Sequence, residues 1–408
     1  MSHLTSNNSQ NGSRAYLHHD SSIFSTEKSL PMIDTFTSES HHTVLHHLPI
    51  ACHHCIATIG QGHNSYISSM VIGGQFLYTG SSDKEIQLWN RNGLSSHMDQ
   101  EYLADNMVIK GNGAVKSMVI SGDKLFSAHQ DHKIRVWKIS GHETQQYKLT
   151  HLATLPTLGD RALKLLTPKN HVQVRRHKKS TWVHHLDTVS ALALSNDGLL
   201  LYSVSWDRTL KIWRTSDFKC LESVANAHDD AINALALSSN GDVYTGSADK
   251  TIKVWRKASE GENHTLVAIL EKHKSGVNAL ALSIDENMLY SGSSDRSIMV
   301  WEKNIDDGNT VAVAALRGHT KSILCLTVIS DLVCSGSADE SIRIWRGIGR
   351  FYICLAVLEG HRGPVKCLTM ERNQEYDDDP SDHTSSYFIY SGGLDRDIKV
   401  WRISIPST

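Results

Sequence analysis

The side chains of this sequence that could perform chemistry are a hydroxyl, an imidazole and a carboxylate that occur together. Thr245 lies four residues before Asp249, Trp255 lies six residues after Asp249, and His228 precedes all three. These are the groups of a Ser-His-Asp hydrolase, in which the imidazole removes the hydroxyl proton and the carboxylate orients the imidazole. Nucleophilic acyl transfer is therefore the first chemistry to consider.

The spacing of these residues is repeated along the chain, and the repetition argues against catalysis. A Ser or Thr, an Asp and a Trp occur with this spacing seven times, and a His precedes six of the seven triples. A repeat protein uses the same side chains in each unit for the same structural purpose. We interpret the complete sets as structural tetrads: His63, Thr79, Asp83 and Trp89; His185, Ser203, Asp207 and Trp213; His228, Thr245, Asp249 and Trp255; His273, Ser291, Asp295 and Trp301; His319, Ser335, Asp339 and Trp345; His361, Ser391, Asp395 and Trp401.

The second unit is incomplete. It contains Ser127, Asp131 and Trp137, but Gly111 occupies the position at which the register places the histidine. A buried carboxylate is costly without a partner. Asp131 is therefore expected to find another partner or to be more exposed to water than the other six aspartates.

Each unit also carries the features of a known repeat. The histidine usually follows a small residue, as in Gly318-His319 and Gly360-His361, and the Trp closes the unit. These features resemble WD40 repeats. The resemblance implies that each unit supplies one four-stranded blade, with the His, Ser/Thr, Asp and Trp hydrogen-bonded in series inside it. Because seven such units fill most of 408 residues, we predict an all-β fold, a seven-bladed WD40 β-propeller.

The ends of the chain predict how the ring closes. After Trp401 only seven residues remain, so the last blade has no fourth strand of its own. An extra strand, Cys55 to Ile59, precedes the first histidine. We expect this N-terminal strand to pair with the last blade, because pairing removes the open sheet edges.

The remaining segments divide the chain. Residues 1–48 are rich in Ser, His and Asn and are predicted to be a disordered tail, whereas 49–408 form the propeller. Leu152 to Leu155 should be the fourth strand of blade two, and an insertion follows at about 156–183, with a short helix expected from Asp160 to Leu166. A second insertion, at about 372–386, is acidic and should be a solvated loop.

The first insertion is strongly basic. From Arg161 to Ser180 there are seven Lys or Arg residues and no Asp or Glu. By the geometry of the resembled family, the insertion joins the blades at the end that carries the histidine loops and the Asp turns, which we call the top face. We therefore expect the insertion to rise over the centre of that face.

Several residues are candidates for binding a partner on the top face. Trp206 precedes a turn Asp where the other units have small, polar or aliphatic residues. It is either an exposed anchor, or packed under the insertion or against Trp182. Basic residues follow most of the turn aspartates, giving that end a positive charge. The predicted partner-binding residues are Arg175, Arg176, Lys178, Lys179, Trp206, Arg208, Arg296 and Arg396.

The insertion also carries a narrower resemblance. Ala-Thr-Leu-Pro-Thr-Leu at 153–158, Pro-Lys-Asn at 168–170 and Val-Gln-Val-Arg-Arg-His-Lys-Lys at 172–179 resemble the plant WD-repeat proteins of the JINGUBANG type. The resemblance implies a regulatory, non-enzymatic protein that acts through protein contacts, with transcription regulators among the expected partners.

Composition and cysteine usage exclude other classes. The formal net charge is −2, and no apolar run or N-terminal leader predicts a membrane span or secretion, so we expect a cytoplasmic or nuclear protein. Seven Cys, an odd number, fit no disulfide framework and are interpreted as reduced strand residues. Cys52 and Cys55 lie near several His pairs, but the strand interpretation of Cys55 is favoured over a zinc site. We predict no cofactor and no metal.

Two functions are compatible with these observations. The first is a monomeric, non-enzymatic scaffold that binds protein partners on the top face of the propeller. The alternative is a protein that binds anionic lipid or nucleic acid through the basic insertion at 161–180. Neither a phosphate-binding loop nor a metal-ligand spacing supports an enzyme.

Overall fold

The structure is a computed structural model of the chain. It describes residues 32–33, 51–60, 63–91, 108–141, 147–159, 171–175, 178–257, 259, 263–304, 309–348, 350–373 and 384–406; residues 32–33, 171–175 and 178–181 are described as backbone alone.

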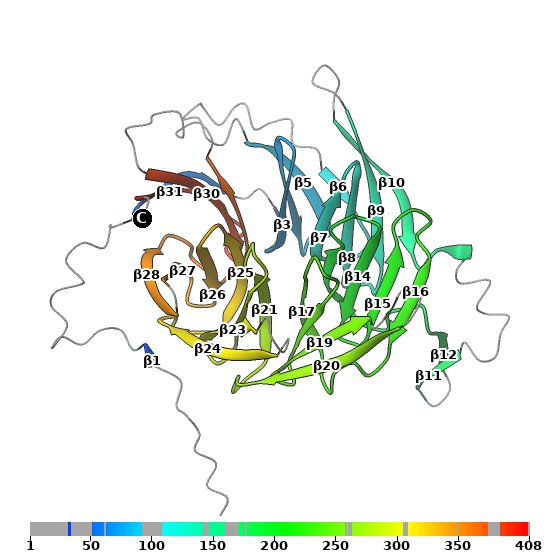
Figure 1. Cartoon of the computed structure of the whole chain (residues 1–408). Helices are drawn as coiled ribbons and strands as arrows, with labels where there is room; N and C mark the ends of the chain where they lie inside the picture. Colours follow the sequence, from blue (N-terminus) through cyan, green and yellow to red (C-terminus); the bar gives the residue numbers. More distant parts are fainter. Residues whose placement is uncertain are drawn as a thin grey trace, which may run out of the picture.

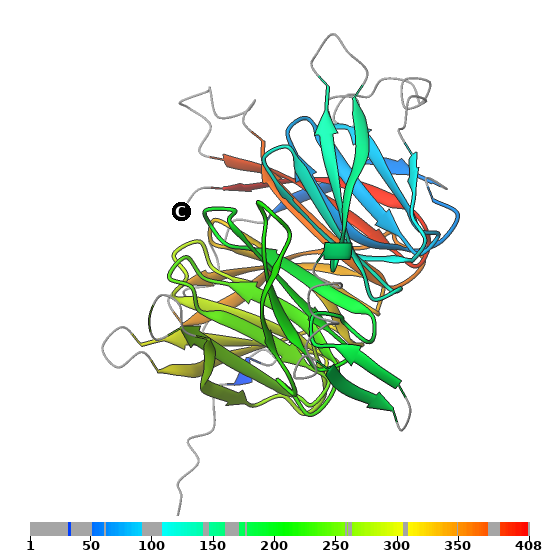
Figure 2. The same cartoon turned by 90° about the vertical axis from the view of Figure 1, so that its right-hand side faces the viewer.

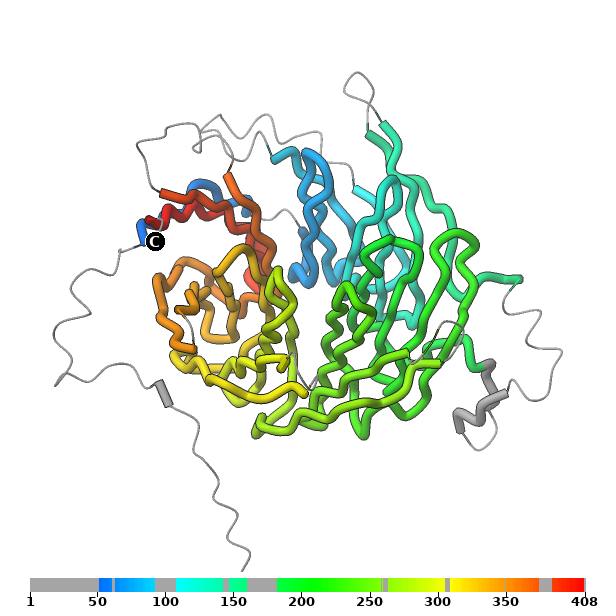
Figure 3. Tube along the Cα trace, in the orientation of Figure 1, coloured from blue at the N-terminus to red at the C-terminus, as the bar shows by residue number. Residues whose placement is uncertain are grey.

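Seven antiparallel sheets form a ring, the blades of a β-propeller (Figures 1 and 3). Blade one contains β3 (Ile67–Gly73), β4 (Phe76–Ser81), β5 (Glu85–Asn90) and β6 (Val108–Lys110). Blade two contains β7 (Val115–Ser121), β8 (Lys124–His129), β9 (Ile134–Ser140) and β10 (Lys148–Leu155). Blade three contains β13 (Val189–Leu194), β14 (Leu200–Ser205), β15 (Leu210–Arg214) and β16 (Cys220–Val224).

The other four blades repeat this order. Blade four contains β17 (Ile232–Leu237), β18 (Val243–Ser247), β19 (Thr251–Lys257) and β20 (His264–Glu271). Blade five contains β21 (Val277–Leu282), β22 (Met288–Ser293), β23 (Ser297–Lys303) and β24 (Thr310–Arg317). Blade six contains β25 (Ile323–Ile329), β26 (Leu332–Ser337), β27 (Ile342–Ile348) and β28 (Phe351–Leu358). Blade seven contains β29 (Val365–Arg372), β30 (Thr384–Gly393), β31 (Ile398–Pro406) and β2 (Cys52–Ile59).

The apolar core lies between neighbouring blades. Tyr202 and Val204 of blade three pack against Ile232, Val243 and Trp255 of blade four, and each of these side chains is at most 6% exposed. The first strands of successive blades contact one another around the whole ring, with β29 against β3, and so form the wall of a central channel. Middle strands are buried on both faces because each blade packs between two neighbours, as the pattern of β26 shows.

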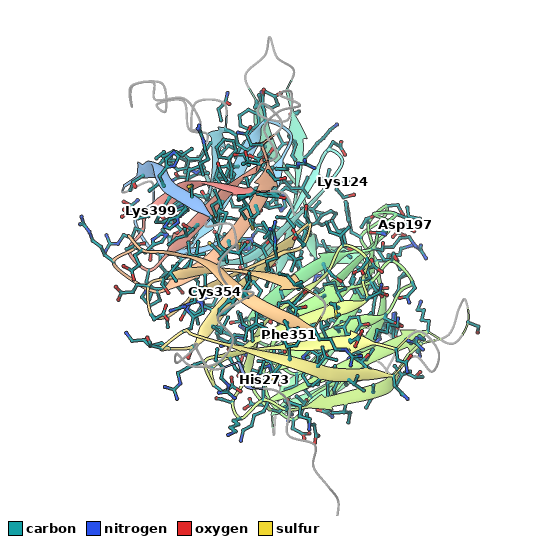
Figure 4. The ribbon with its side chains drawn as sticks, turned by 60° about the vertical axis from the view of Figure 1, so that its left-hand side comes forward. Lys124, Asp197, His273, Phe351, Cys354 and Lys399 are labelled. Atoms are coloured by element: carbon teal, nitrogen blue, oxygen red, sulfur yellow. The ribbon has the colours of Figure 1, made fainter. Side chains whose placement is uncertain are left out.

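The N-terminal strand closes the ring as the sequence predicts. Strand β2 pairs antiparallel with β31, from Cys52 opposite Ser404 to Ile59 opposite Ile398, and completes the sheet of blade seven. The Lys399 ammonium group donates to Thr58 Oγ1 at 3.1 Å across the same seam (Figure 4). The predicted fourth strand of blade two is also confirmed, since Leu152 to Leu155 end β10.

The first insertion forms a hairpin. Strands β11 (His171–Arg175) and β12 (Lys178–Thr181) pair antiparallel as a two-stranded sheet of their own. Blades two and three, which this insertion connects, lie side by side in the ring (Figures 1 and 2). That the basic insertion rises over the centre of the top face stays a prediction. The helix expected from Asp160 to Leu166 lies outside the described residues.

The other two segments outside the regular repeats are described in part. Strands β29 and β30 extend to Arg372 and from Thr384, so they occupy the two ends of the insertion expected at 372–386, and residues 374–383 lie outside the described chain. Within the predicted tail, β1 (Met32–Ile33) pairs parallel with β24, Met32 opposite Ala315 and Ile33 opposite Leu316. The rest of 1–48 is not described.

Candidate functional site

The complete tetrads form the hydrogen-bonded series that the resemblance implied. In blade four, Trp255 Nε1 donates to Thr245 Oγ1 at 2.9 Å, and Thr245 Oγ1 lies 2.7 Å from His228 Nε2. His228 Nδ1 lies 2.8 Å from Asp249 Oδ2. Because the carboxylate can only accept, Nδ1 carries the proton and the hydroxyl donates to Nε2. The same series occurs in blades one, five, six and seven. In blade three, His185 Nδ1 lies 2.9 Å from Thr209 Oγ1 and 3.4 Å from Asp207 Oδ2.

Burial rules out the tetrad hydroxyls as nucleophiles. Thr79, Ser127, Ser203, Thr245, Ser291, Ser335 and Ser391 each have 0% of their surface exposed. Each hydroxyl accepts the indole N–H of its blade, and no substrate can approach a hydroxyl enclosed in this way. The Ser/His/Asp sets therefore stabilise the blades and do not catalyse a reaction.

The tetrad aspartates also fix the loops of the top face. Asp249 Oδ2 accepts from the backbone N–H of Asp229 at 3.1 Å, and Asp249 Oδ1 accepts from the N–H of Thr251 at 2.9 Å. One carboxylate thus joins the histidine loop to the turn between β18 and β19. The next residue, Lys250, has a φ of 76°, in the left-handed region. The equivalent residue has a positive φ in every blade: Lys84, His132, Arg208, Lys250, Arg296, Glu340 and Arg396.

Blade two completes its series with a histidine at the end of its second strand, in place of the usual histidine in the loop before the first strand. His129, at the end of β8, places Nε2 2.8 Å from Ser127 Oγ, and Trp137 Nε1 donates to the same hydroxyl at 2.8 Å. His129 Nδ1 donates to the Gly113 carbonyl at 2.7 Å. A Cβ added at Gly111 would lie 3.4 Å from the His129 ring, so this ring borders the space that the usual histidine would enter.

Asp131 has the other partner that the sequence required. Both of its carboxylate oxygens accept from Arg135, at 2.5 and 3.1 Å, and the Arg135 side chain is only 6% exposed. The contacts of Arg135 hold the pKa of Asp131 below its ordinary value, against the opposing effect of burial. Blade two therefore replaces the His–Asp pair with two separate interactions.

The buried histidines predict that acid destabilises the ring. Burial lowers the pKa of His63, His185 and His228 despite their aspartates, and burial with the Arg135 charge lowers the pKa of His129 to about 4. The unfolded chain, with histidine pKa values near 6.5, binds protons that the folded chain excludes, so stability falls as pH falls below about 6.5. Thermal unfolding followed by circular dichroism should give a lower Tm at pH 5 than at pH 7.5, and an unchanged Tm would contradict this.

The channel opens beside an aromatic and cationic cluster. A cavity of about 730 Å³ lies in the channel and is lined by residues of all seven first strands together with Tyr66, Trp206 and Leu394. Lys116, on β7, donates to the Tyr66 hydroxyl at 3.2 Å. Its Nζ lies 5.6 Å from the centre of the Tyr66 ring and 5.9 Å from that of Trp206, which is cation–π range.

Comparison with protein families places these features. The model of the WD domain, G-beta repeat, matches residues 53–90, 176–214, 218–256, 264–302, 310–346 and 352–402, more than half of the chain. The chain belongs to the WD40 family. The matched segments leave out residues 91–175, which contain blade two. In that blade Gly111 stands at the position of the usual WD40 histidine, and His129 supplies the imidazole.

Individual relatives match over shorter stretches. An uncharacterized WD repeat-containing protein of Schizosaccharomyces pombe is 27% identical over 38% of this chain and 42% of its own length. Striatin-3 of Rattus norvegicus is 31% identical over 35% of this chain and 20% of its own. Ribosome biogenesis protein ytm1 of Neosartorya fischeri is 28% identical over 33% and 30% respectively. This WD40 chain thus matches less than half the length of these relatives.

The predicted partner-binding residues belong to the turns of the WD40 blades and to the hairpin of the insertion. Trp206 is 42% exposed and lines the channel, while Trp182 packs against the apolar cluster of blades two and three. Of the alternatives considered for Trp206, the structure therefore shows the exposed one. Arg208, Arg296 and Arg396 are exposed on their turns. Arg175, Lys178 and Lys179 lie on the hairpin of β11 and β12, and their side chains and Arg176 lie outside the described part.

Sequence reasoning missed three residues of the channel mouth. Tyr66, Lys116 and Lys366 line the cavity but belong to no tetrad or turn. A signal was available, because Lys116 and Lys366 each follow the first buried residue of a first strand, Val115 and Val365. The residues at this position of the first strands line the channel.

The described residues contain one group whose geometry could suit a metal. Donor atoms of His63, Asp83 and Glu85 lie within 4.8 Å of one another. His63 already uses both ring nitrogens in its tetrad, and Glu85 contacts Lys110 at 3.3 Å, so these groups have structural partners.

Cys55 is a strand residue opposite Trp401, as predicted, and all seven cysteines are free thiols. In the described part, moreover, no helix has the length and apolar character needed to cross a membrane.

Proposed function

We propose that this WD40 protein is a non-enzymatic scaffold that binds protein partners on its top face. WD40 propellers generally act as protein-interaction scaffolds, and the enclosed tetrad hydroxyls leave these residues no catalytic role. The observation that carries the proposal is Trp206, an indole 42% exposed at the channel mouth beside Lys116. Exposed aromatic side chains with a cationic neighbour are typical of interface hot spots.

The proposal extends to the kind of partner. The insertion resembles the plant JINGUBANG type, which supports a regulatory role, with transcription regulators among the partners and a cytoplasmic or nuclear location. Relatives of the same fold bear names from different processes, such as the pre-mRNA-splicing factor PRP46 of Candida albicans, 40% identical over 17% of this chain and 17% of its own length. Such variety on one fold supports partner choice by surface residues, here Arg175, Arg176, Lys178 and Lys179 together with the turn arginines.

Replacing Trp206 should mainly accelerate dissociation of the partner. Trp206→Ala removes an aromatic anchor worth about 2 kcal/mol, which corresponds to about 30-fold in the dissociation rate. Partners are first captured with the wild-type chain and identified by quantitative mass spectrometry, and binding of the purified partner is then followed by surface plasmon resonance. Phe351→Ala is the matched control, because Phe351 is 70% exposed on the outer strand β28 (Figure 4).

The basic insertion separates this function from the alternative one. Reversing the charges of Arg175, Arg176, Lys178 and Lys179 should slow association of the protein partner. A variant that deletes the basic insertion should keep Trp182 and Val183. The Trp182 carbonyl accepts from the buried Lys211 ammonium group, and Val183 is fully buried. If these variants lose only binding to anionic vesicles or RNA while the captured proteins are unaltered, the lipid or nucleic-acid function replaces the scaffold.

A further inference from the structure

One position of each first strand lines the channel. It is the residue that follows the first buried apolar residue of the strand. In four blades this residue donates to a carbonyl of the neighbouring first strand: Ser68 to Val115, Ser190 to Ile232, Asn233 to Val277 and Asn278 to Ile323. A short polar side chain at this position therefore joins adjacent blades.

Two blades place a lysine at this position instead. Lys116 of β7 and Lys366 of β29 are longer than the Ser and Asn side chains and carry a positive charge. Neither ammonium group forms an ion pair with a carboxylate of the described residues, whereas Lys110, Lys219 and Lys303 each do. The two lysines thus carry charge that the inter-blade contact does not require and that the described chain leaves uncompensated.

Tyr66 lies between the two lysines. Its blade, blade one, stands between blade seven, which carries Lys366, and blade two, which carries Lys116. Burial raises the pKa of Tyr66, but hydrogen bonds with Ser82 and Lys116 and the charges of Lys116 and Lys366 outweigh burial and hold that pKa below its ordinary value. Tyr66, Lys116 and Lys366 all line the same cavity.

The rest of the cavity favours an anion with an apolar neighbour. Its charged lining residues in the described chain are Lys116 and Lys366, and no Asp or Glu lines it. A concave wall with charge of one sign raises the local concentration of the opposite ion. Trp206 and Leu394, which are 42% and 46% exposed, provide apolar surface at the same mouth. A volume of about 730 Å³ accommodates a few side chains and is too small for a folded domain.

We propose that the channel mouth binds an oxyanion side chain of a partner peptide, with the anion held by Lys116, Lys366 and the Tyr66 hydroxyl and a neighbouring apolar residue packed on Trp206. The oxyanion is a carboxylate of Asp or Glu, or a phosphate monoester on Ser or Thr. This inference rests on the proposed scaffold function and adds the chemistry of the partner.

Peptide selection tests the inference directly. A phage-displayed library of random dodecapeptides is selected on the full chain, and selected peptides should be enriched in Asp or Glu next to an apolar residue. The affinity of one such peptide, measured by fluorescence anisotropy, should fall about tenfold or more in Lys116→Met and in Lys366→Met and should weaken as NaCl rises. Replacing its acidic residue by Gln should cause the same loss, and phosphoserine there distinguishes phosphate from carboxylate.

Controls separate binding from folding. Lys148→Met removes the same charge from the exposed start of β10 and should leave affinity unchanged. The lysine variants should keep the wild-type Tm, because neither lysine pairs with a described carboxylate; Tyr66→Phe, which removes only the hydroxyl, is a second test if either fails to fold. Peptides without acidic enrichment, binding that survives both lysine variants, or no selected peptide at all would each overturn the inference. Partner capture that still depends on Trp206 would then leave the scaffold function standing.

Discussion

Removal of residues 1–61 is expected to abolish the soluble monomeric ring, whereas removal of residues 1–48 should leave the Tm almost unchanged. The longer deletion removes β2, whose pairing with β31 completes blade seven, and with it the buried side chains of Ala51 and Ile59. The exposed edge of β31 then offers unpaired N–H and C=O groups to other chains. Size-exclusion chromatography with light scattering should show aggregates for the longer deletion and a monomer for the shorter one.

The shorter deletion is the matched control for this experiment. It retains Ala51 and all of β2 and loses only β1 among the described strands, which contributes two residue pairs beside β24. Thermal unfolding then reports whether ring closure or the tail supplies the stability. Identical behaviour of the two deletions would show that β2 does not close the ring.

Replacing His129 by Ala should destabilise the protein by about 2–4 kcal/mol, measured by urea unfolding. The substitution leaves a cavity beside Gly111, removes one of the partners of Ser127 Oγ, and leaves the Gly113 carbonyl without the His129 donor. Unsatisfied buried polar groups account for a large part of such losses. The stability of this blade therefore depends on a residue that belongs to no tetrad in the sequence.

A double substitution tests whether His129 replaces the missing tetrad histidine. The variant Gly111→His/His129→Ser restores the arrangement of blades one and three to six, in which a histidine precedes the first strand and a serine ends the second, as Ser205 and Ser247 do. It should recover much of the stability that His129→Ala loses. His132→Ala, at an exposed turn position, should have little effect. A loss at His132 equal to that at His129 would contradict the structural assignment.

The local pattern of the sequence was sufficient for the fold and for part of the site. Seven repetitions of one Ser/Thr–Asp–Trp spacing determine the number of blades, because each unit can bury its apolar faces only against its neighbours. The strand from Cys55 to Ile59 predicted the closure, because a propeller leaves one strand unpaired if the chain does not supply it. Trp206 stood out because its turn position holds small, polar or aliphatic residues in the other blades.

The tertiary structure decided which side chains meet in space. His129 reaches Ser127 from the same strand β8, and alignment of the repeats does not show this because the histidine stands at an aligned serine position. The pairing of Arg135 with Asp131 is likewise not shown by alignment of the repeats. Lys116, Tyr66 and Lys366 come from three blades and are separated by up to 300 residues, so only ring closure brings their charges to one channel mouth. Spacing along the chain determines which side chains each blade contains, whereas burial and the packing of blades determine which of them meet.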